Sequence, residues 1–299
     1  MAEKKKISLV LSSGGARGLA HIGVIEEILR RGHSITAISG SSMGAFVGGL
    51  FAAGTLQGYK NWVLDLDKLD VFNLIDFTFS SHGFIKGEKV FDEMKKQGFI
   101  PKVNIEKLPI PLSIVAADII KNEEVIFTSG DLYDAIRASV SIPNVFTPIE
   151  LPDGMLVDGG VMNPLPINHI PKIDSDLIIA VDVNALIPYK KPKLPKVNKV
   201  EVYEEQNTID QLKAKWNEFF LNNQKKNPKK DKLGYFDMLN RTIQVMQDKI
   251  IQYTIETSPP DILIQISKHA GGSFEFFKAK EFIEAGRQTC AAVLDNNDL

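Results

Sequence analysis

The chain has little cysteine, no long hydrophobic run and no excess of positive charge, and each absence excludes a class of protein. One cysteine, Cys290, in 299 residues cannot close a disulfide within the chain, so we expect a reducing compartment. No stretch approaches the roughly 18 apolar residues of a membrane span, and Ile7 to Leu11 is too short for a signal peptide. A net charge of -2 gives no overall basic field for nucleic acid. The sequence therefore predicts a cytoplasmic protein that binds no nucleic acid and meets a membrane only from outside.

Short apolar runs alternate with segments of helical period, a pattern typical of a mostly parallel sheet covered by helices. The predicted strands are Ile7 to Leu11, Ile35 to Ser39, Leu112 to Ala117, Glu124 to Phe127, Met155 to Val157 and Leu177 to Val183. Helices are predicted from Leu19 to Leu29, Met43 to Ala53 and Asp131 to Val140. With 44% hydrophobic residues, the chain is expected to fold as one domain over residues 1–299.

The segment 188–232 differs from the rest because it holds twelve lysines and only six acidic residues. Between its lysine-rich flanks, five apolar residues fall at helical spacing, namely Ile209, Leu212, Trp216, Phe219 and Phe220. Two interpretations stay open. The segment is either a surface insertion whose stripe packs on the core, or a lid or membrane-facing anchor that meets anionic lipid. The phenylalanine-rich stretch from Phe72 to Phe84 is interpreted as core filling.

A serine stands between two glycines in Gly40-Ser41-Ser42-Met43-Gly44, where a predicted strand gives way to a predicted helix. This spacing is that of the nucleophile elbow, a strained turn that exposes a serine hydroxyl while the glycines leave room for neighbouring backbone. The N-terminus of the following helix would add a positive dipole at the hydroxyl. The pattern favours Ser42 as a nucleophile over a serine in an ordinary turn.

A serine nucleophile needs hydrogen-bond donors for the oxyanion that it creates, and the loop Gly14-Gly15-Ala16-Arg17-Gly18 can supply backbone N–H groups. A dinucleotide or phosphate loop is the weaker interpretation, because Ser13 breaks the pattern G-x-G-x-x-G and no P-loop Lys-Ser/Thr follows. The Arg17 side chain can orient the loop, hold an anionic substrate or pair with a surface carboxylate.

The serine also needs a base that takes its proton. Asp158 is a candidate because an apolar run delivers it to a glycine turn, and a dry site would raise its pKa far enough for that role. Asp118 and Asp182 also end apolar runs and stay as alternatives. A triad of Ser42, Asp158 and His269 has an allowed residue order, but the elbow lies too early in the chain for an α/β-hydrolase.

Three segments taken together carry a family resemblance: Ser13 to Gly18, Gly40 to Gly44, and Asp158-Gly159-Gly160. Similarity continues through Gly18 to Val24, Ile136 to Pro143 and Phe282 to Gly286. In the order and spacing of these motifs the chain resembles the patatin-like phospholipase family in its bacterial branch. The resemblance covers most of the chain outside the lysine-rich segment. Ser13 is a departure, since it stands where the family's glycine run begins with glycine.

The resemblance implies a three-layer α/β/α fold with a mostly parallel central sheet. It also implies a lipid acyl hydrolase of the phospholipase A or lysophospholipase type, acting through an acyl-enzyme without a metal or cofactor. By position, Ser42 would be the nucleophile, Asp158 the base, and the N–H groups around Gly14, Gly15 and Arg17 the oxyanion hole. His21 matches a position outside this dyad and is interpreted as structural.

The implied partner is a phospholipid or another acyl-ester lipid, with peripheral contact to an anionic membrane through the lysine-rich segment. An acyl thioesterase or acyltransferase that uses the same dyad stays an alternative, because different acceptors can resolve one acyl-enzyme. A non-catalytic lipid-binding module that keeps the fold is a second alternative, since function resides in sites and not in folds.

Overall fold

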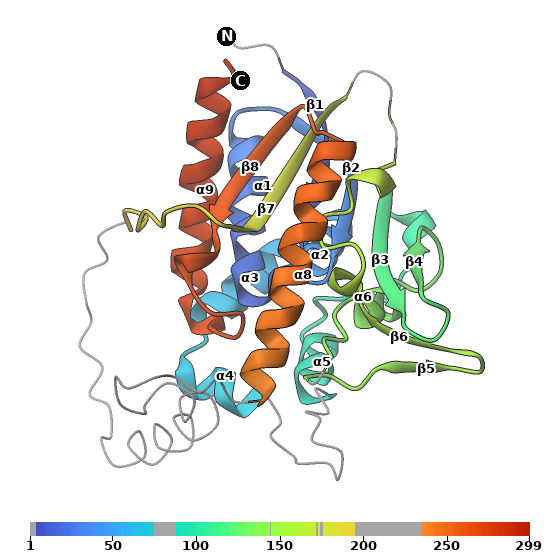
Figure 1. Cartoon of the computed structure of the whole chain (residues 1–299). Coiled ribbons are helices and arrows are strands. Elements are labelled where there is room, and N and C mark those ends of the chain that lie inside the picture. Colours follow the sequence, from blue (N-terminus) through green and yellow to red (C-terminus); the bar gives the residue numbers. More distant parts are fainter. Residues whose placement is uncertain (1–3, 75–87, 144, 172, 174–175, 195–234) are drawn as a thin grey trace, which may run out of the picture.

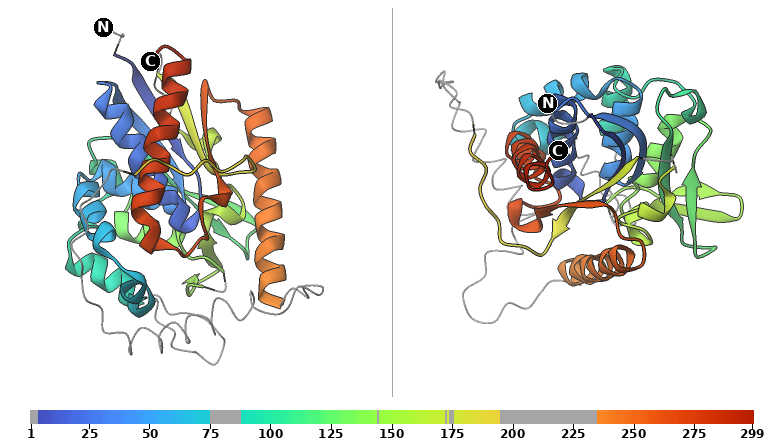
Figure 2. Two further views of the ribbon diagram at one scale, coloured as in Figure 1. Left: turned by 90° about the vertical axis from the view of Figure 1, so that its left-hand side faces the viewer. Right: turned by 90° about the horizontal axis from the view of Figure 1, so that it is seen from above.

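The computed structural model of the chain describes residues 4–74, 88–143, 145–171, 173, 176–194 and 235–299. In these ranges eight strands form one mixed sheet with helices on both of its faces (Figure 1). The helix α8 (Tyr235–Thr257) covers one face, and the sheet separates it from α1 (Ala20–Arg30) and α9 (Ala279–Asn296) on the other (Figure 2). The three-layer α/β/α fold expected from the sequence is therefore confirmed.

Five parallel strands form the centre of the sheet. Their order across the sheet is β3 (Leu112–Asp118), β2 (Ser34–Ser41), β1 (Lys6–Leu11), β7 (Leu177–Ala185) and β8 (Ile262–Ser267). Three antiparallel strands extend it beyond β3, namely β4 (Glu123–Phe127), β6 (Gly154–Asp158) and β5 (Ile149–Leu151). The six predicted strands all form within two residues of their expected ends, whereas β5 and β8 were not predicted.

The helices on the face opposite α8 include two that the sequence predicted. These are α2 (Met43–Ala52), which follows β2, and α6 (Leu132–Ser139), whose first turn is capped by the Asp131 carboxylate. The predicted helix from Leu19 starts as a short 3₁₀ helix, Gly15–Leu19, that continues into α1. Three further helices lie toward one end of the sheet: α3 (Leu56–Asp65), α4 (Lys68–Leu74) and α5 (Glu88–Lys96) (Figure 1).

Strands buried on both faces explain why their sequences are continuously apolar. On β1, Leu9 and Leu11 belong to the large cluster that packs with α1, α2 and α9. The residue between them, Val10, belongs to a smaller cluster on the other face, which includes Ile251 of α8. The side chains of β1 therefore alternate between two hydrophobic clusters, one on each face of the sheet. The smaller cluster packs α8 against the sheet.

Part of the sequence prediction lies outside the described residues. The apolar stripe from Ile209 to Phe220 falls there, as does most of the stretch from Phe72 to Phe84. At the start of the lysine-rich segment, residues 188–194 are described without regular secondary structure, and Tyr189 packs against the large cluster. Within the described ranges, no helix combines the length and apolarity that crossing a bilayer requires.

The attachment of α8 predicts a stability difference between two of its residues. Ile251, 4% exposed, packs against the sheet, whereas Val245, 59% exposed, faces away. We expect Ile251→Ala to lower the free energy of unfolding by about 2 to 5 kcal/mol, because it removes buried methyl groups and leaves a cavity. The matched variant Val245→Ala should change it by less than about 0.5 kcal/mol. Urea unfolding of both variants measures the difference, and equal losses would contradict this packing.

Candidate active site

The candidate nucleophile and the candidate base are brought together by two strands that meet on one edge of β3. β2 runs parallel to β3, and its last residue, Ser41, pairs with Val115. β6 runs in the opposite direction along the same edge, and its last residue, Asp158, pairs with Ala116. Because Val115 and Ala116 are adjacent, the ends of the two strands face each other. Ser42, one residue beyond β2, therefore lies beside Asp158.

The chain leaves β6 through a glycine turn that has no room for a side chain. A Cβ atom on Gly159 would lie 2.1 Å from the carbonyl oxygen of Val115. The next residue, Gly160, donates its N–H to Asp158 Oδ1 at 2.8 Å, and its carbonyl accepts a hydrogen bond from Gln247 Nε2 of α8 at 2.9 Å. The turn thus fixes the carboxyl group, and α8 supports the turn.

Ser42 occupies a strained turn between β2 and α2, the geometry of a nucleophile elbow. Its φ of 54° and ψ of -123° lie in a region that residues other than glycine rarely adopt. The backbone of β1 approaches closely, since a Cβ on Gly44 would lie 2.2 Å from Leu11 O. The Ser139 hydroxyl fixes the turn, because it accepts the N–H of Ser42 at 2.9 Å and donates to Val115 O at 2.6 Å.

A buried hydrogen bond joins the two candidate residues. Ser42 Oγ donates to Asp158 Oδ2, and the two residues are 4% and 5% exposed. Burial raises the pKa of Asp158 to about 7, while the hydrogen bonds from Ser42 and Gly160 oppose that rise. A carboxyl group whose pKa lies near neutral pH can accept a proton and return it, as a general base requires. The pair can therefore move a proton from a serine hydroxyl to a carboxylate.

The glycine-rich loop between β1 and α1 offers unpaired backbone donors beside the serine. Gly14 and Gly15 line a cavity together with Ser42, and neither N–H has an acceptor within the described residues. The next N–H, that of Ala16, is already used, since it donates to Ser273 O at 2.8 Å. Two adjacent free N–H groups near a nucleophile are what an oxyanion hole needs.

The side chain of Arg17 is buried, and within the described ranges it is hydrogen-bonded to no carboxylate. Its Nη1 donates to Gly271 O at 3.1 Å and to Ser273 Oγ at 3.2 Å, and its Nη2 donates to Asn184 Oδ1 at 2.7 Å. Burial lowers the pKa of Arg17, while the charges of Asp182 and Asp248 raise it. Of the interpretations of Arg17, orientation of the loop fits these contacts, and pairing with a surface carboxylate is wrong.

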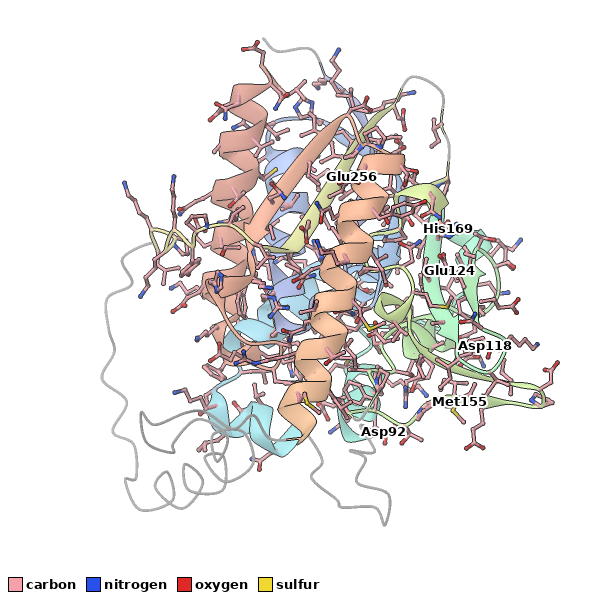
Figure 3. The ribbon with its side chains drawn as sticks, viewed as in Figure 1. Asp92, Asp118, Glu124, Met155, His169 and Glu256 are labelled. Carbon is pink, nitrogen blue, oxygen red and sulfur yellow. The ribbon has the colours of Figure 1, made fainter. Side chains whose placement is uncertain are left out.

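The other aspartates that end apolar runs are engaged elsewhere. Asp118 lies near Met155 (Figure 3), whose backbone N–H donates to its Oδ1 at 3.2 Å. Asp182 accepts the N–H of Asn184 at 2.8 Å. Neither carboxyl group is hydrogen-bonded to Ser42 within the described residues, so the geometry selects Asp158 among the three candidates.

The histidines do not complete a triad in the described part of the chain. His269 lines a cavity that includes neither Ser42 nor Asp158. His21 is fully buried, its Nε2 lies 2.9 Å from Ser12 O, and burial lowers its pKa to about 4, as a structural role would have it. In the described ranges no group of three or more His, Cys, Asp or Glu side chains is placed to hold a metal ion.

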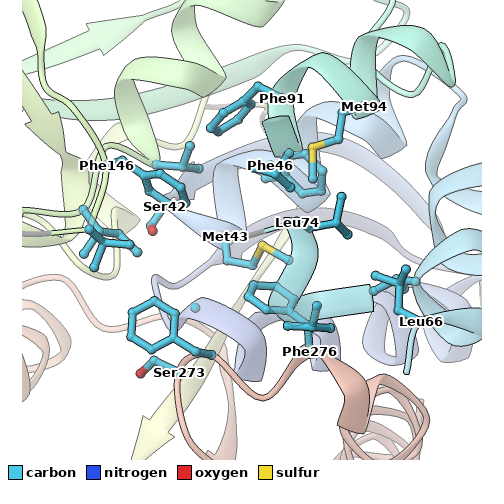
Figure 4. A pocket seen from close by; sticks show the side chains of 18 of the residues that line it. Ser42, Met43, Phe46, Leu66, Leu74, Phe91, Met94, Phe146, Ser273 and Phe276 are labelled. Atoms are coloured by element: carbon cyan, nitrogen blue, oxygen red, sulfur yellow. The ribbon is translucent and has the colours of Figure 1, made fainter. Parts of the chain in front are cut away.

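An apolar cavity of about 920 Å³ opens at Ser42. Figure 4 shows the Ser42 hydroxyl at its wall, with aromatic and methionine side chains around the hollow. These side chains come from α2, α3, α4 and α5 and from two loops, and include Met43, Phe46, Trp62, Leu74, Phe91, Met94, Phe146 and Phe276. We name this space the acyl cavity, because its apolar lining matches a hydrocarbon chain.

Several residues of the site were missed by the sequence reasoning. Ser139 lies inside the segment Ile136 to Pro143, where the family similarity was a signal that this reasoning did not use. Ser273 lies in the loop after β8 and accepts hydrogen bonds from both the glycine-rich loop and Arg17. Asn184 lies near the end of β7 and accepts a hydrogen bond from Arg17. No local pattern marks these two, because their role depends on contacts with a loop more than 160 residues away.

The site geometry predicts the titration of Asp158. We expect its carboxyl group to titrate near pH 7 instead of at its ordinary value of 3.8, because it is desolvated. In Ser42→Ala the pKa should rise further, since the carboxylate loses a donor. Infrared difference spectra between wild type and Asp158→Asn isolate the carboxyl band during a pH titration. A midpoint near pH 4 would show that the group is solvated.

Comparisons with known proteins identify the family of the chain. A family model described as patatin-like phospholipase matches residues 9–170. An uncharacterized NTE family protein of Mycobacterium tuberculosis (strain ATCC 25618 / H37Rv) is 33% identical over 97% of this chain and 91% of its own length. Lysophospholipase NTE1 of Pyricularia oryzae is 32% identical over 61% of this chain and 12% of its own length. The crystal structure of VipD from Legionella pneumophila aligns with a TM-score of 0.47 and 15% identity, over 98% of this chain and 67% of that chain. From the family match and the near full-length relative, we conclude that this chain belongs to the patatin-like phospholipase family.

Proposed function

We propose that this chain is a lipid acyl hydrolase, a serine esterase of the phospholipase A or lysophospholipase type that works through the dyad of Ser42 and Asp158. Membership of the patatin-like phospholipase family supports lipid hydrolysis in general. The observation that carries the finer proposal is the buried hydrogen bond from Ser42 Oγ to Asp158 Oδ2 at the mouth of the acyl cavity.

Acylation begins with the attack of Ser42 Oγ on the ester carbonyl carbon while Asp158 takes the hydroxyl proton. The oxyanion that forms receives hydrogen bonds from the N–H groups of Gly14 and Gly15. Collapse of the tetrahedral intermediate breaks the bond to the alcohol, which receives the proton from Asp158. A carboxyl group with a pKa near 7 suits both steps, because it accepts and releases the proton at neutral pH.

Deacylation repeats the sequence with water in place of the serine. Asp158 takes a proton from the water molecule, the resulting hydroxide attacks the acyl carbon, and Ser42 Oγ leaves with the returned proton. The fatty acyl chain stays in the acyl cavity through both steps. Its burial among apolar side chains supplies binding free energy that a short ester cannot provide.

The first test is covalent labelling of the nucleophile. A fluorophosphonate probe should label the wild-type protein at Ser42, because the dyad activates the hydroxyl to displace fluoride. Ser42→Ala should abolish labelling, and Asp158→Asn should abolish both labelling and release of fatty acid from a lysophospholipid. Mass spectrometry locates the adduct, and circular dichroism confirms that both variants fold. Labelling that survives in Ser42→Ala would place the nucleophile elsewhere.

The contacts of Ser139 generate a second test. Ser139→Ala leaves the N–H of Ser42 without its acceptor, so the strained turn loses its anchor while the dyad residues remain. We expect kcat to fall about tenfold, which corresponds to about 1.4 kcal/mol, a typical hydrogen-bond contribution. The matched control is Ser113→Ala, a buried serine of β3, with kcat within about twofold of wild type. Similar losses in both variants would indicate a general packing effect.

The raised pKa of Asp158 predicts how the rate depends on pH. A general base must be ionised, so kcat/KM for a water-soluble 4-nitrophenyl ester should rise as pH increases through about 7 and level off above it. The apparent pKa should be the same in His269→Ala, because that histidine is not part of the dyad. Loss of this ionisation in His269→Ala would instead assign the base to the histidine.

A further inference from the structure

A second cavity starts at the same serine and has a different chemical character. It has a volume of about 770 Å³ and is lined by Ser42 and Asp158, by polar side chains that include Arg17, Asn184 and Gln247, and by apolar side chains on other parts of its wall. Gly15, Ser42 and Ser273 also line the acyl cavity, so the two spaces adjoin at the nucleophile. An ester bound at Ser42 therefore has within reach an apolar space and a second space of mixed lining, which we name the polar space for its wall of Arg17, Asn184 and Gln247.

The polar space continues outward into a third cavity of about 540 Å³. Four residues line both spaces, namely Arg17, Asn184, Gln244 and Gln247, and the outer cavity adds Asp248, Lys268 and His269. Every described residue that lines this outer cavity is polar or charged. We name it the outer polar cavity. It lies between α8, which contributes Gln244, Gln247 and Asp248, and the short 3₁₀ helix Lys268–Ala270 that follows β8.

Two cationic side chains and one anionic side chain line the outer polar cavity, and a second carboxyl group, that of Asp182, lies buried behind them. Arg17 and Lys268 are cationic, and Asp248 is anionic. Lys268 Nζ donates to Asp248 Oδ2 at 2.8 Å, with the two side chains 25% and 19% exposed. Behind this lining Asp182 is buried, and burial raises its pKa to about 6. The charge of Asp248 raises the pKa of both Arg17 and Asp182, so the Asp248 carboxylate interacts electrostatically with both side chains.

The cavity also keeps hydrogen-bond donors that the described residues do not use. Lys268 spends one of its three N–H donors on Asp248. Arg17 is 9% exposed, and its two Nη atoms are occupied, while its Nε is buried and has no hydrogen-bond partner in the described part of the chain. Unused cationic donors beside a solvent-accessible cavity match an anionic oxygen ligand.

We propose that the outer polar cavity binds the phosphodiester headgroup of the substrate, while the acyl chain that is cleaved occupies the acyl cavity. The inference rests on the proposed function, since it assigns the two ends of an ester to two cavities that meet at Ser42. An acyl chain does not match the outer polar cavity, because it would desolvate Lys268 and Asp248 without replacing their hydrogen bonds. In this arrangement the leaving alcohol carries the phosphodiester into the outer polar cavity.

The experiment compares two soluble esters that differ only in the headgroup, 1-octanoyl-glycero-3-phosphoglycerol and 1-octanoylglycerol. The readout is the ratio of their kcat/KM values, phosphodiester over glycerol ester. Lys268→Met should lower this ratio about tenfold, the loss of about 1.4 kcal/mol that one charge-assisted hydrogen bond supplies. Asp248→Asn should raise the ratio about threefold or more, because it frees Lys268 and removes a charge that repels phosphate.

Opposite shifts in the two variants separate headgroup binding from a structural ion pair. If the pair only stabilised the fold, both variants would lower the melting temperature and neither would change the ratio. Lys249→Met is the matched control, since this exposed lysine of α8 bonds to Gln252 outside the cavity and its loss should leave the ratio unchanged. An unchanged ratio in active Lys268→Met, or a lowered ratio in Asp248→Asn, would overturn the headgroup assignment.

A binding measurement tests the cavity without turnover. Calorimetric titration of Ser42→Ala with glycero-3-phosphoglycerol should show binding that weakens about tenfold when Lys268→Met is added, and that weakens with salt. If the wild-type protein hydrolyses both esters but neither it nor Ser42→Ala binds glycero-3-phosphoglycerol, the headgroup site is overturned while the proposed function stands. A protein that binds the phosphodiester but hydrolyses neither ester, and whose Ser42 is not labelled, would overturn the proposed function and leave the binding site standing.

Discussion

One buried hydrogen bond, from the Ser42 hydroxyl to the Asp158 carboxyl, is the constraint on which the rest of the site depends. Raising the pKa of Asp158 from 3.8 to about 7 corresponds to disfavouring its ionised form by about 4 kcal/mol. The folded chain therefore holds a proton that the unfolded chain releases, and its stability falls as pH rises from about 4 to 7. At the pH where a general base works, this destabilisation is fully present. The rest of the fold has to offset it.

The offset comes from the backbone more than from side chains. β2 and β6 meet end to end along β3, and each is paired with β3 in a fixed register. The backbones of Ser42 and Asp158 therefore cannot separate without breaking these strand pairs. Ser139 and Gly160 add one hydrogen bond to each partner. The positive φ of Ser42 is a further local cost that this framework sustains. A rigid sheet thus maintains an arrangement that would relax in a flexible loop.

Local sequence signals predicted the parts of the structure that are built from contiguous residues. The elbow, the glycine loop and the strands could be predicted because close backbone approach requires glycine and full burial requires apolar runs. Asp118, Asp158 and Asp182 each end an apolar run, and the sequence favoured Asp158 through its glycine turn and the family resemblance, whereas the contact with Ser42 depends on the pairing of β6 with β3. The helices α3 to α5, which form much of the acyl cavity, have mixed polar faces and were not predicted. The exposed residue Gln265 interrupts the apolar sequence of β8, so this strand lacks the continuous apolar run that marked the predicted strands.

Arg17 connects the proposed oxyanion hole with the proposed headgroup site, because it belongs to the glycine-rich loop and its side chain lines both polar cavities. Its guanidinium binds Ser273 Oγ, while the carbonyl of Ser273 accepts the N–H of Ala16, so one residue clamps the loop through side chain and backbone. The same guanidinium binds Asn184, which lines both polar spaces. A ligand that engages this wall acts on the group that positions Gly14 and Gly15. In the mechanism that we propose, binding free energy from a headgroup is expressed at the N–H groups of Gly14 and Gly15, where it lowers the barrier instead of only tightening the ground state.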